Sequence, residues 1–501
     1  MLRKWLDPVE TKPLYFFSAI IVIYLITRFF NLELIPIFND ESTYIRYGMH
    51  EYNEPVFKAY SLLIGKEPLL PYLFAVFGTA VNNLLLGSRI VSIIFGLFTL
   101  VGLILFTKEA LNRKVAALVA VLYVLSPFNL FFDRLALLDS AINTVAIWSL
   151  YLTYLILKNP KWVLGAALGF IVGIGLYIKT SAFFYLFLPV AAIALTFIPK
   201  FEISKDKKML TQVIGFSFLV SLLLFVPLFQ SEYYVIHLEL LNQYTYPLSS
   251  VFSFPVANWI ANFSNLSVWV IFYLTPFLFS AAVIGFFYLV KKPKYFPIIL
   301  WFILPLTYEV LYAKLFTSRH VLLLTVPLLI ASGWGIYNLY LKNRAITYFL
   351  ILGIFIGTIF SNYLIWFTPE KASSFLPRQV RGDIGQYFKG FSSGYGVVEA
   401  IDYVKKQSEK GNTNVVIRND HGNPEDAVVG YLGYEPNIQL LLISDVESFE
   451  KIISQKVLNE PMYYVSRGAY YGGMEKYLTE EKKFSKPNDS EFVGVYKIKL
   501  K

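Results

Sequence analysis

Residues 90–107 of the chain read IVSIIFGLFTLVGLILFT and carry no charged side chain. A helix that crosses a bilayer needs about 20 predominantly apolar residues, and this run is close to that length. The whole chain has the same character: 56% of its 501 residues are hydrophobic and only 16% are charged, against about 25% in soluble domains. The composition therefore excludes an ordinary soluble protein and predicts a polytopic α-helical membrane protein.

Further apolar runs lie on both sides of this one. By length and polarity, eleven membrane-spanning helices are expected, at residues 14–31, 90–107, 114–131, 140–157, 162–178, 181–198, 211–229, 267–290, 295–312, 321–340 and 345–366. The stretch 69–86 is open, because Pro71 and the pair Asn82-Asn83 favour an interfacial or re-entrant helix over a span. The chain is thus predicted to have about 11 to 13 transmembrane helices.

Basic residues gather in alternate connections between these runs. If the N-terminus is cytoplasmic, the cytoplasmic connections hold Arg3, Lys4, Lys12, Lys108, Arg113, Lys114, Lys158, Lys161, Lys200, Lys205, Lys207, Lys208, Lys291, Lys292, Lys294, Lys342 and Arg344. Cytoplasmic connections are enriched in Lys and Arg, so the pattern predicts a multi-pass protein of the cell membrane with a cytoplasmic N-terminus. It also accounts for the net charge of +10, so we expect no nucleic-acid partner. The absence of Cys excludes thiolate chemistry and disulfides.

The composition divides the chain into two parts. Residues 1–367 are expected to form the transmembrane domain, with longer outer loops at 32–89 and 230–266. From residue 368 onward the sequence is more charged and alternates between helical and strand patterns. The expected helices are 397–410 and 446–456, and the expected strands are 414–418, 438–443, 461–465 and 492–498. Residues 368–501 therefore predict a small α/β domain on the extracytoplasmic face.

This orientation places a set of charged residues on the outer face. The acidic members are Asp40, Glu41 and Asp139, and the basic members are Lys66, Arg134, Lys179 and Arg319. The carboxylates could act as a general base for an acceptor hydroxyl. Asp40 and Asp139, with His320, could instead be ligands for a divalent cation. The cations could neutralise a phosphate leaving group. A base beside a phosphate site is the arrangement that sugar transfer from a phosphate ester requires.

Each of these residues also has a purely structural interpretation. Asp40-Glu41 fits a solvated pair in a loop, and Asp133-Arg134 fits a local ion pair at a helix end. Basic residues such as Lys179 and Arg319 commonly extend from span ends to the membrane interface. His320 fits a packing histidine at a helix end. The residue types alone leave these alternatives open.

The order of the features resembles that of the GT-C glycosyltransferases, in particular the branch with protein O-mannosyltransferases and the lipid A aminoarabinose transferase. The resemblance covers about residues 14–366. The motifs that carry it are Asp40-Glu41 after the first span, Lys66 before an interfacial helix, Gly87-Ser88-Arg89, the segment RLALLD at 134–139, and the segment RHVLLL at 319–324.

The resemblance implies an inverting transfer from a dolichyl- or undecaprenyl-linked sugar to an acceptor on the external face. It implies that Asp40 is the catalytic carboxylate, with Glu41 beside it as an acceptor-orienting or ligand group. Lys66 would meet the carrier phosphate, and Asp139 would be the acidic residue that ends the 134–139 motif. Glu67 departs from the family's Lys-Pro-Pro pattern and places a carboxylate next to Lys66. Some members use a divalent metal and others do not, so metal dependence stays open.

We therefore expect a glycosyltransferase whose partners are a polyprenyl-phosphate-linked sugar, membrane lipids, and an acceptor hydroxyl on a lipid, glycan or protein. The alternative is a transporter or flippase of a lipid-linked saccharide, which would share the helices and the basic outer residues. Alternating access favours polar groups near the middle of the membrane, whereas here they gather at one surface. A third interpretation is a structural subunit without catalysis, and the Asp40-Glu41 pair argues against it.

Overall fold

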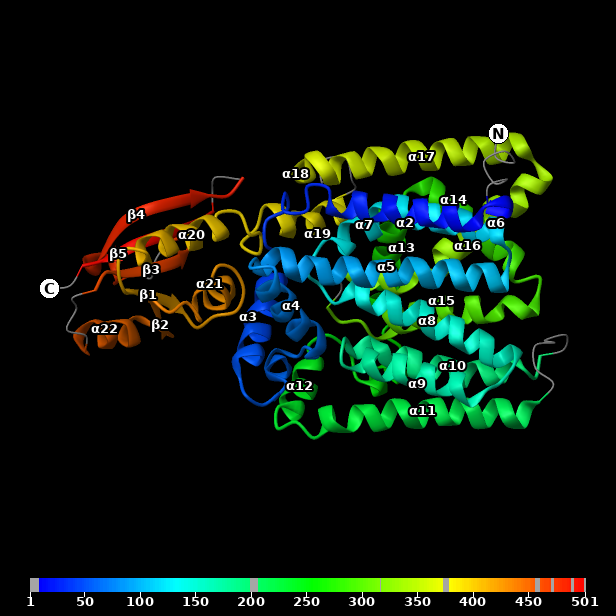
Figure 1. The fold of residues 1–501 in the computed structure, drawn as a ribbon, viewed down its shortest axis with the longest axis horizontal. Helices are drawn as coiled ribbons and strands as arrows, with labels where there is room; N and C mark the ends of the chain where they lie inside the picture. Colours follow the sequence, from blue (N-terminus) through cyan, green and yellow to red (C-terminus); the bar gives the residue numbers. More distant parts are fainter. Residues whose placement is uncertain are drawn as a thin grey trace.

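The computed structural model describes residues 9–198, 206–315, 317–372, 378–455, 460–469, 473–487 and 491–499. A body of long helices, many of them running along the longest axis of the molecule, carries an α/β region at one end (Figure 1). The body contains α2 Pro13–Phe29, α3 Asn39–Asn53, η1 Tyr60–Ile64, α4 Leu69–Ala80, α5 Leu84–Ala110, α6 Arg113–Leu125, α7 Pro127–Asp133, α8 Asp139–Lys158, α9 Trp162–Leu176, η2 Thr180–Ala182, α10 Phe183–Leu195, α11 Lys207–Phe229, α12 Tyr234–Leu241, η3 Leu248–Ser253, α13 Val256–Tyr273, α14 Pro276–Leu289, η4 Pro293–Tyr295, α15 Phe296–Tyr312, η5 Ser318–Val321, α16 Leu322–Lys342 and α17 Arg344–Phe367.

The polytopic helical fold predicted from the composition is confirmed. Within the described residues, six helices are long and apolar enough to cross a membrane, or up to eight candidate spans if each of two bent helix pairs counts as one. The six are α5, α8, α11, η4 with α15, η5 with α16, and α17. The expected spans at 14–31, 162–178 and 181–198 correspond to shorter apolar helices of 10–17 residues. The open stretch 69–86 contains the short helix α4, followed by a turn and the start of α5.

Two expected spans are bent where a proline follows. The pair α6 and α7 bends by 62° at Ser126, before Pro127, and the pair α13 and α14 bends by 111° at Thr275, before Pro276. A residue that precedes proline is pushed out of the helical conformation, and Thr275 has a φ of 74°. The expected span 267–290 thus covers the end of α13 and the whole of α14, which meet at the sharper of the two bends.

Helices α14 and α16 approach each other closely through small residues. Ala281 and Gly285 on α14 face Ala331 and Gly335 on α16, and a Cβ built on Gly285 would overlap the Ala331 carbonyl oxygen. Small residues four positions apart allow this approach in membrane helices. The contact holds the second half of the helical body together.

Gly285→Ala is expected to lower the stability of the protein, because the two helices must separate to admit the methyl group. Overpacking of this kind costs about 1–3 kcal/mol. Thermal unfolding in detergent measures the effect. The matched control is Gly215→Ala on α11, where a Cβ would meet nothing within 4 Å. Equal unfolding temperatures for the two variants would contradict the close contact.

The C-terminal region is an α/β region, as the sequence predicts, and its sheet is mixed and has five strands rather than the four expected. Its elements are α18 Pro369–Ala372, α19 Arg378–Phe388, α20 Val397–Ser408, β1 Thr413–Arg418, α21 Glu425–Leu432, β2 Ile438–Ile443, α22 Val446–Gln455, β3 Met462–Arg467, η7 Glu475–Tyr477, β4 Leu478–Ser485 and β5 Phe492–Ile498. The strand order is β2-β1-β3-β5-β4, with β1 parallel to β2 and β3, and β5 antiparallel to β3 and β4. Helix α21 packs against α3 of the helical body, and the two lie at the junction in Figure 1.

Candidate active site

A cavity of about 570 Å³ lies beside α3, at the end of the helical body that carries the α/β region. Its charged lining residues are Lys66, Glu67, Asp139, Lys179, Glu309, Arg319 and His320. Its aromatic lining residues are Tyr44, Phe183, Phe184, Tyr244 and Tyr308. Sites for small ligands have this character, with apolar walls and a few convergent polar groups. The structure thus brings Lys66, Asp139, Lys179 and Arg319 together from four separate segments of the chain.

Asp40 is tied to this cavity through Arg319. It is the second residue of α3, which begins after the extended residue Phe38. Arg319 Nη1 donates to Asp40 Oδ2 at 2.7 Å, and the two side chains are 19% and 24% exposed. Burial raises the pKa of Asp40, but the Arg319 and Lys66 charges, with hydrogen bonds from Arg319 and Asn39, hold the pKa below its ordinary value. The carboxylate is therefore ionised at neutral pH and able to accept a proton.

Lys66 presents a positive charge to the cavity. No ion pair involves Lys66 within the described part of the chain, and its Nζ lies 4.7 Å from the centroid of the Tyr244 ring. The neighbouring carboxylate of Glu67 accepts a hydrogen bond from Thr180 Oγ1 and lies 3.7 Å from His237 Nε2. The change from the family's Lys-Pro-Pro pattern therefore leaves Lys66 able to meet an anion.

Asp139 and Lys179 form an ion pair in the cavity wall. Asp139 is the first residue of α8, and Lys179 Nζ donates to its Oδ1 at 2.6 Å. Asp139 is buried, whereas Lys179 is 25% exposed. A lysine held in this way cannot extend freely to the membrane interface, so the structure places it in the cavity rather than at the surface. Part of its charge is neutralised by Asp139.

Glu41 lies next to Asp40 in sequence but does not line the cavity. Its carboxylate accepts from Arg89 Nε at 2.9 Å and from Arg89 Nη2 at 2.8 Å. It also accepts from the backbone N–H groups of Phe38 and Ala136, at 2.8 and 2.7 Å. The side chain is fully buried, and these donors occupy both oxygens. Glu41 therefore meets Arg89 and two backbone N–H groups, and the acceptor-orienting role that the resemblance implies stays a prediction.

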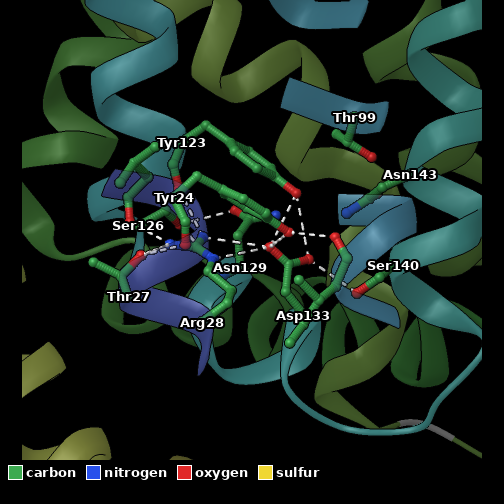
Figure 2. Close-up of polar contacts among 12 residues, drawn as sticks. Tyr24, Thr27, Arg28, Thr99, Tyr123, Ser126, Asn129, Asp133, Ser140 and Asn143 are labelled. Atoms are coloured by element: carbon green, nitrogen blue, oxygen red, sulfur yellow. Dashed lines mark hydrogen bonds and ion pairs between the residues drawn. The ribbon is translucent and has the colours of Figure 1, made fainter. Parts of the chain in front are cut away.

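Asp133 and Arg134 are also separate from the cavity, and they do not pair with each other. Figure 2 shows Asp133 among Arg28, Tyr24, Tyr123 and Ser140, which all hydrogen bond to its carboxylate. Arg28 Nη2 lies 3.3 Å from Asp133 Oδ2, and both side chains are buried. This network fastens α2 to α6, α7 and α8. Asp133 and Arg134 therefore do not form the local ion pair that is their structural alternative.

Arg134 does not line the cavity, and its expected phosphate contact stays a prediction. Its Nη2 donates to the carbonyl oxygens of Phe30 and Asn31, at 2.8 and 2.6 Å, and its side chain is buried. It therefore holds the end of α2 in place.

The three residues considered as metal ligands do not form one ligand set. Among the described residues, no group of three or more His, Cys, Asp or Glu side chains could hold a metal ion. Asp40 contacts Arg319, Asp139 contacts Lys179, and His320 Nδ1 lies 3.4 Å from Glu309 Oε2.

Several cavity residues are absent from the sequence-based site. Tyr44 lies one helical turn after Asp40, and a helical reading of residues 39–53 would have placed it on the same face. Glu309 lies in an expected span, where a buried carboxylate is a signal of function. Thr180 and Tyr244 have no clear signal in the sequence, because only the fold brings Thr180 to Glu67 and Tyr244 to Lys66.

Comparison with known proteins agrees with this architecture. Residues 66–229 match the model of the family described as dolichyl-phosphate-mannose-protein mannosyltransferase. No curated protein sequence matches the chain.

Solved structures match over almost the whole chain. ArnT from Cupriavidus metallidurans in the apo state has a TM-score of 0.62 at 12% sequence identity, covering 98% of each chain. The same protein bound to undecaprenyl phosphate has a TM-score of 0.58 at 12% identity and covers 96% of this chain and 97% of that one. The Archaeoglobus fulgidus oligosaccharyltransferase AglB, in complex with an inhibitory peptide and a dolichol-phosphate, has a TM-score of 0.54 at 12% identity and covers 91% of this chain and 70% of that one. The resemblance to the GT-C glycosyltransferases drawn from the sequence is thereby confirmed, and the chain has an ArnT-like fold.

Proposed function

We propose that the protein is an integral-membrane glycosyltransferase that moves a sugar from a polyprenyl-phosphate carrier to an acceptor hydroxyl with inversion at the anomeric carbon. The observation that supports this most is the cavity itself, in which Lys66, Lys179 and Arg319 converge and Arg319 contacts the ionised Asp40. The structures of ArnT with undecaprenyl phosphate and of AglB with a dolichol-phosphate support a carrier of this chemical class.

In the proposed reaction Asp40 acts as the general base. It accepts the proton of the acceptor hydroxyl while the hydroxyl oxygen attacks the anomeric carbon of the sugar. The bond between that carbon and the phosphate oxygen breaks, and the electron pair leaves with the polyprenyl phosphate. Lys66 and Arg319 stabilise the negative charge that develops on the phosphate. Asp139 holds Lys179 in position in the same wall.

A second, apolar cavity supports a lipid carrier. It has a volume of about 230 Å³ and is lined by Ser318, directly before Arg319, and by the aromatic residues Phe128, Phe131, Phe132, Phe272, Tyr273, Phe360, Tyr387 and Phe388. An isoprenoid chain would bury apolar area there while its phosphate lies near Arg319.

The proposed orientation follows from the basic connections between the helices. The N-terminus is cytoplasmic, and the cavity and the domain formed by residues 368–501 are extracytoplasmic. Reporter fusions placed after residue 368 test this, with a cytoplasmic signal as the contrary result.

The proposed function is tested by transfer of label in vesicles. Purified protein in lipid vesicles receives radiolabelled polyprenyl-phosphate sugars and a membrane extract as the source of acceptor. The expected result is protein-dependent movement of label from the carrier to an acceptor. Movement of intact labelled carrier across sealed vesicles, with no transfer of sugar, would instead identify a flippase.

Lys66→Ala is expected to weaken binding of the polyprenyl phosphate by about 10- to 150-fold, because a charge-assisted hydrogen bond contributes about 1.5–3 kcal/mol. Equilibrium binding of labelled polyprenyl phosphate measures the change. Lys58→Ala is the matched control, because Lys58 lies in the same segment but does not line the cavity. Equal dissociation constants for the two variants would exclude Lys66 from the phosphate site.

A further inference from the structure

The C-terminal region contacts the helical body at the start of α3. Asn423 donates from its backbone N–H to Asn39 Oδ1 at 2.9 Å, and from Nδ2 to the Ile37 carbonyl oxygen at 3.0 Å. Asn39 in turn donates its backbone N–H to the Ser392 carbonyl oxygen at 3.0 Å. The residues directly before Asp40 are thus bonded to two segments of the C-terminal region.

Asp426 makes a second set of contacts one turn along α3. Its Oδ2 accepts from Thr43 Oγ1 at 2.5 Å, and its Oδ1 accepts from Arg46 Nη1 at 2.7 Å. The Gly422 N–H donates to the same carboxylate at 2.7 Å, which fixes the loop that carries Asn423. Asp426 and Asn423 are both buried. A buried carboxylate with three donors forms a well-defined connection between two parts of a chain.

The backbone of the C-terminal region also approaches α3 too closely for a side chain. Gly422 has a φ of 103°, and a Cβ built there would overlap Asn39 Oδ1. Glycine alone fits both the conformation and the contact. The first turn of α3, residues 39–43, is therefore enclosed on one side by the C-terminal region.

We propose that Asn423 and Asp426 are positioning residues that hold the first turn of α3, and with it Asp40, against Arg319. This inference rests on the proposed role of Asp40 as the base. On the opposite side, Glu41 fixes the same turn to Arg89, so the turn is held from the helical body and from the C-terminal region together. Asp40 pairs with Arg319 at 2.7 Å, and the direction in which its carboxylate points depends on the turn that carries it.

The expected consequence is kinetic. A displacement of about 1 Å at a reacting group can cost about 100-fold in rate. Asn423→Ala removes the Nδ2 donor to the Ile37 and Ser392 carbonyl oxygens, and Thr43→Val removes the hydroxyl that donates to Asp426. We expect the turnover number of each variant to fall by about 10- to 100-fold. The Michaelis constant for the carrier should change little, because Lys66, Lys179 and Arg319 belong to the helical body.

The experiment compares four variants of the full-length protein in the vesicle transfer assay. Asn423→Ala and Thr43→Val are the test variants. Thr43→Ser keeps the hydroxyl that Asp426 accepts and should restore the wild-type rate. Asp445→Ala is the control, because Asp445 caps α22 in the same region through Ser448 and lies apart from α3. Size-exclusion profiles and carrier binding establish that each variant is folded.

The pH profile separates misplacement of Asp40 from a loss of folded protein. The charged groups that lower the pKa of Asp40 are Arg319 and Lys66, and its neighbour on α3 is Tyr44. If the turn moves away from Arg319, the pKa of Asp40 rises and the acid limb of the turnover number shifts to higher pH. A smaller active fraction lowers the rate at every pH without that shift.

The outcomes distinguish the inference from the function on which it rests. A lower turnover number, a raised acid limb and rescue by Thr43→Ser would support the positioning role. Test variants that behave like Asp445→Ala would overturn it, as would a change confined to the Michaelis constant for the acceptor, which indicates acceptor binding instead. If the proposed function itself is wrong, the wild-type protein transfers no sugar in this assay.

Discussion

Replacement of Asp40 by Asn is expected to lower the turnover number by about 10²- to 10⁴-fold, which is the usual contribution of general acid–base catalysis. An amide has the size of the carboxylate and still accepts a hydrogen bond from Arg319, but it cannot take the proton of the acceptor hydroxyl. Carrier binding should be equal to that of the wild type or tighter, because Arg319 loses its counter-charge. Single-turnover transfer and equilibrium binding of the carrier measure the two effects separately.

The pH dependence of the transfer rate is a second test of Asp40. Asp40 must be ionised to act as a base, and Arg319 and Lys66 hold its pKa below the ordinary value. The wild-type rate should therefore persist as the pH falls through the ordinary range of an aspartate, and decline only below it. Asp445→Asn, at the exposed carboxylate directly before α22, serves as the control for loss of a negative charge. Equal transfer by the wild type and Asp40→Asn would remove Asp40 from the role of base.

Replacement of Glu41 by Gln is expected to destabilise the protein by about 3–5 kcal/mol, because removal of one partner leaves the buried charge of Arg89 uncompensated. Arg89 also donates to the carbonyl oxygens of Leu32 and Ile35, at 2.7 and 2.8 Å, so the variant would loosen the chain between α2 and α3. The thermal unfolding temperature and the yield of monodisperse protein in detergent measure the loss.

The control for this variant is Glu33→Gln, in the same segment, where the carboxylate is bonded to Asn83 at an exposed position. Little change is expected there. Two adjacent acidic residues should thus give opposite results, with Asp40→Asn folded but slow and Glu41→Gln poorly folded. If the Glu41→Gln variant is well folded but transfers sugar slowly, Glu41 has a role in catalysis.

The fold was largely predictable because bilayer crossing depends on properties that a sequence displays directly. Long apolar runs located the helices, and the strand pattern located four of the five strands. Strand β4 was missed because its sequence, LTEEKKFS, lies at the sheet edge and lacks an alternating apolar face. Helix α3 was missed because its sequence is polar. Its first turn is nevertheless partly buried, because the carboxylate of Glu41 pairs with Arg89 inside the helical body.

The site was predictable only in part. Lys66, Asp139, Lys179 and Arg319 could be grouped because each lies at an end of a helix on the same predicted face. The choice between Asp40 and Glu41, or between Asp133 and Arg134, depends on which partner each side chain meets. Those partners, Arg89 and Arg28 among them, lie 48 and 105 residues away in the chain. Only the fold shows which residues so far apart in the sequence become partners.

The position of the carrier phosphate tests the central proposal most directly. A structure of the protein in lipid nanodiscs with bound polyprenyl phosphate would show it. We expect phosphate oxygens within about 3 Å of Lys66 Nζ and of the Arg319 guanidinium, with Asp40 facing the adjoining space. A phosphate bound outside this cavity, beyond the reach of Lys66 and Arg319, would contradict the proposed site.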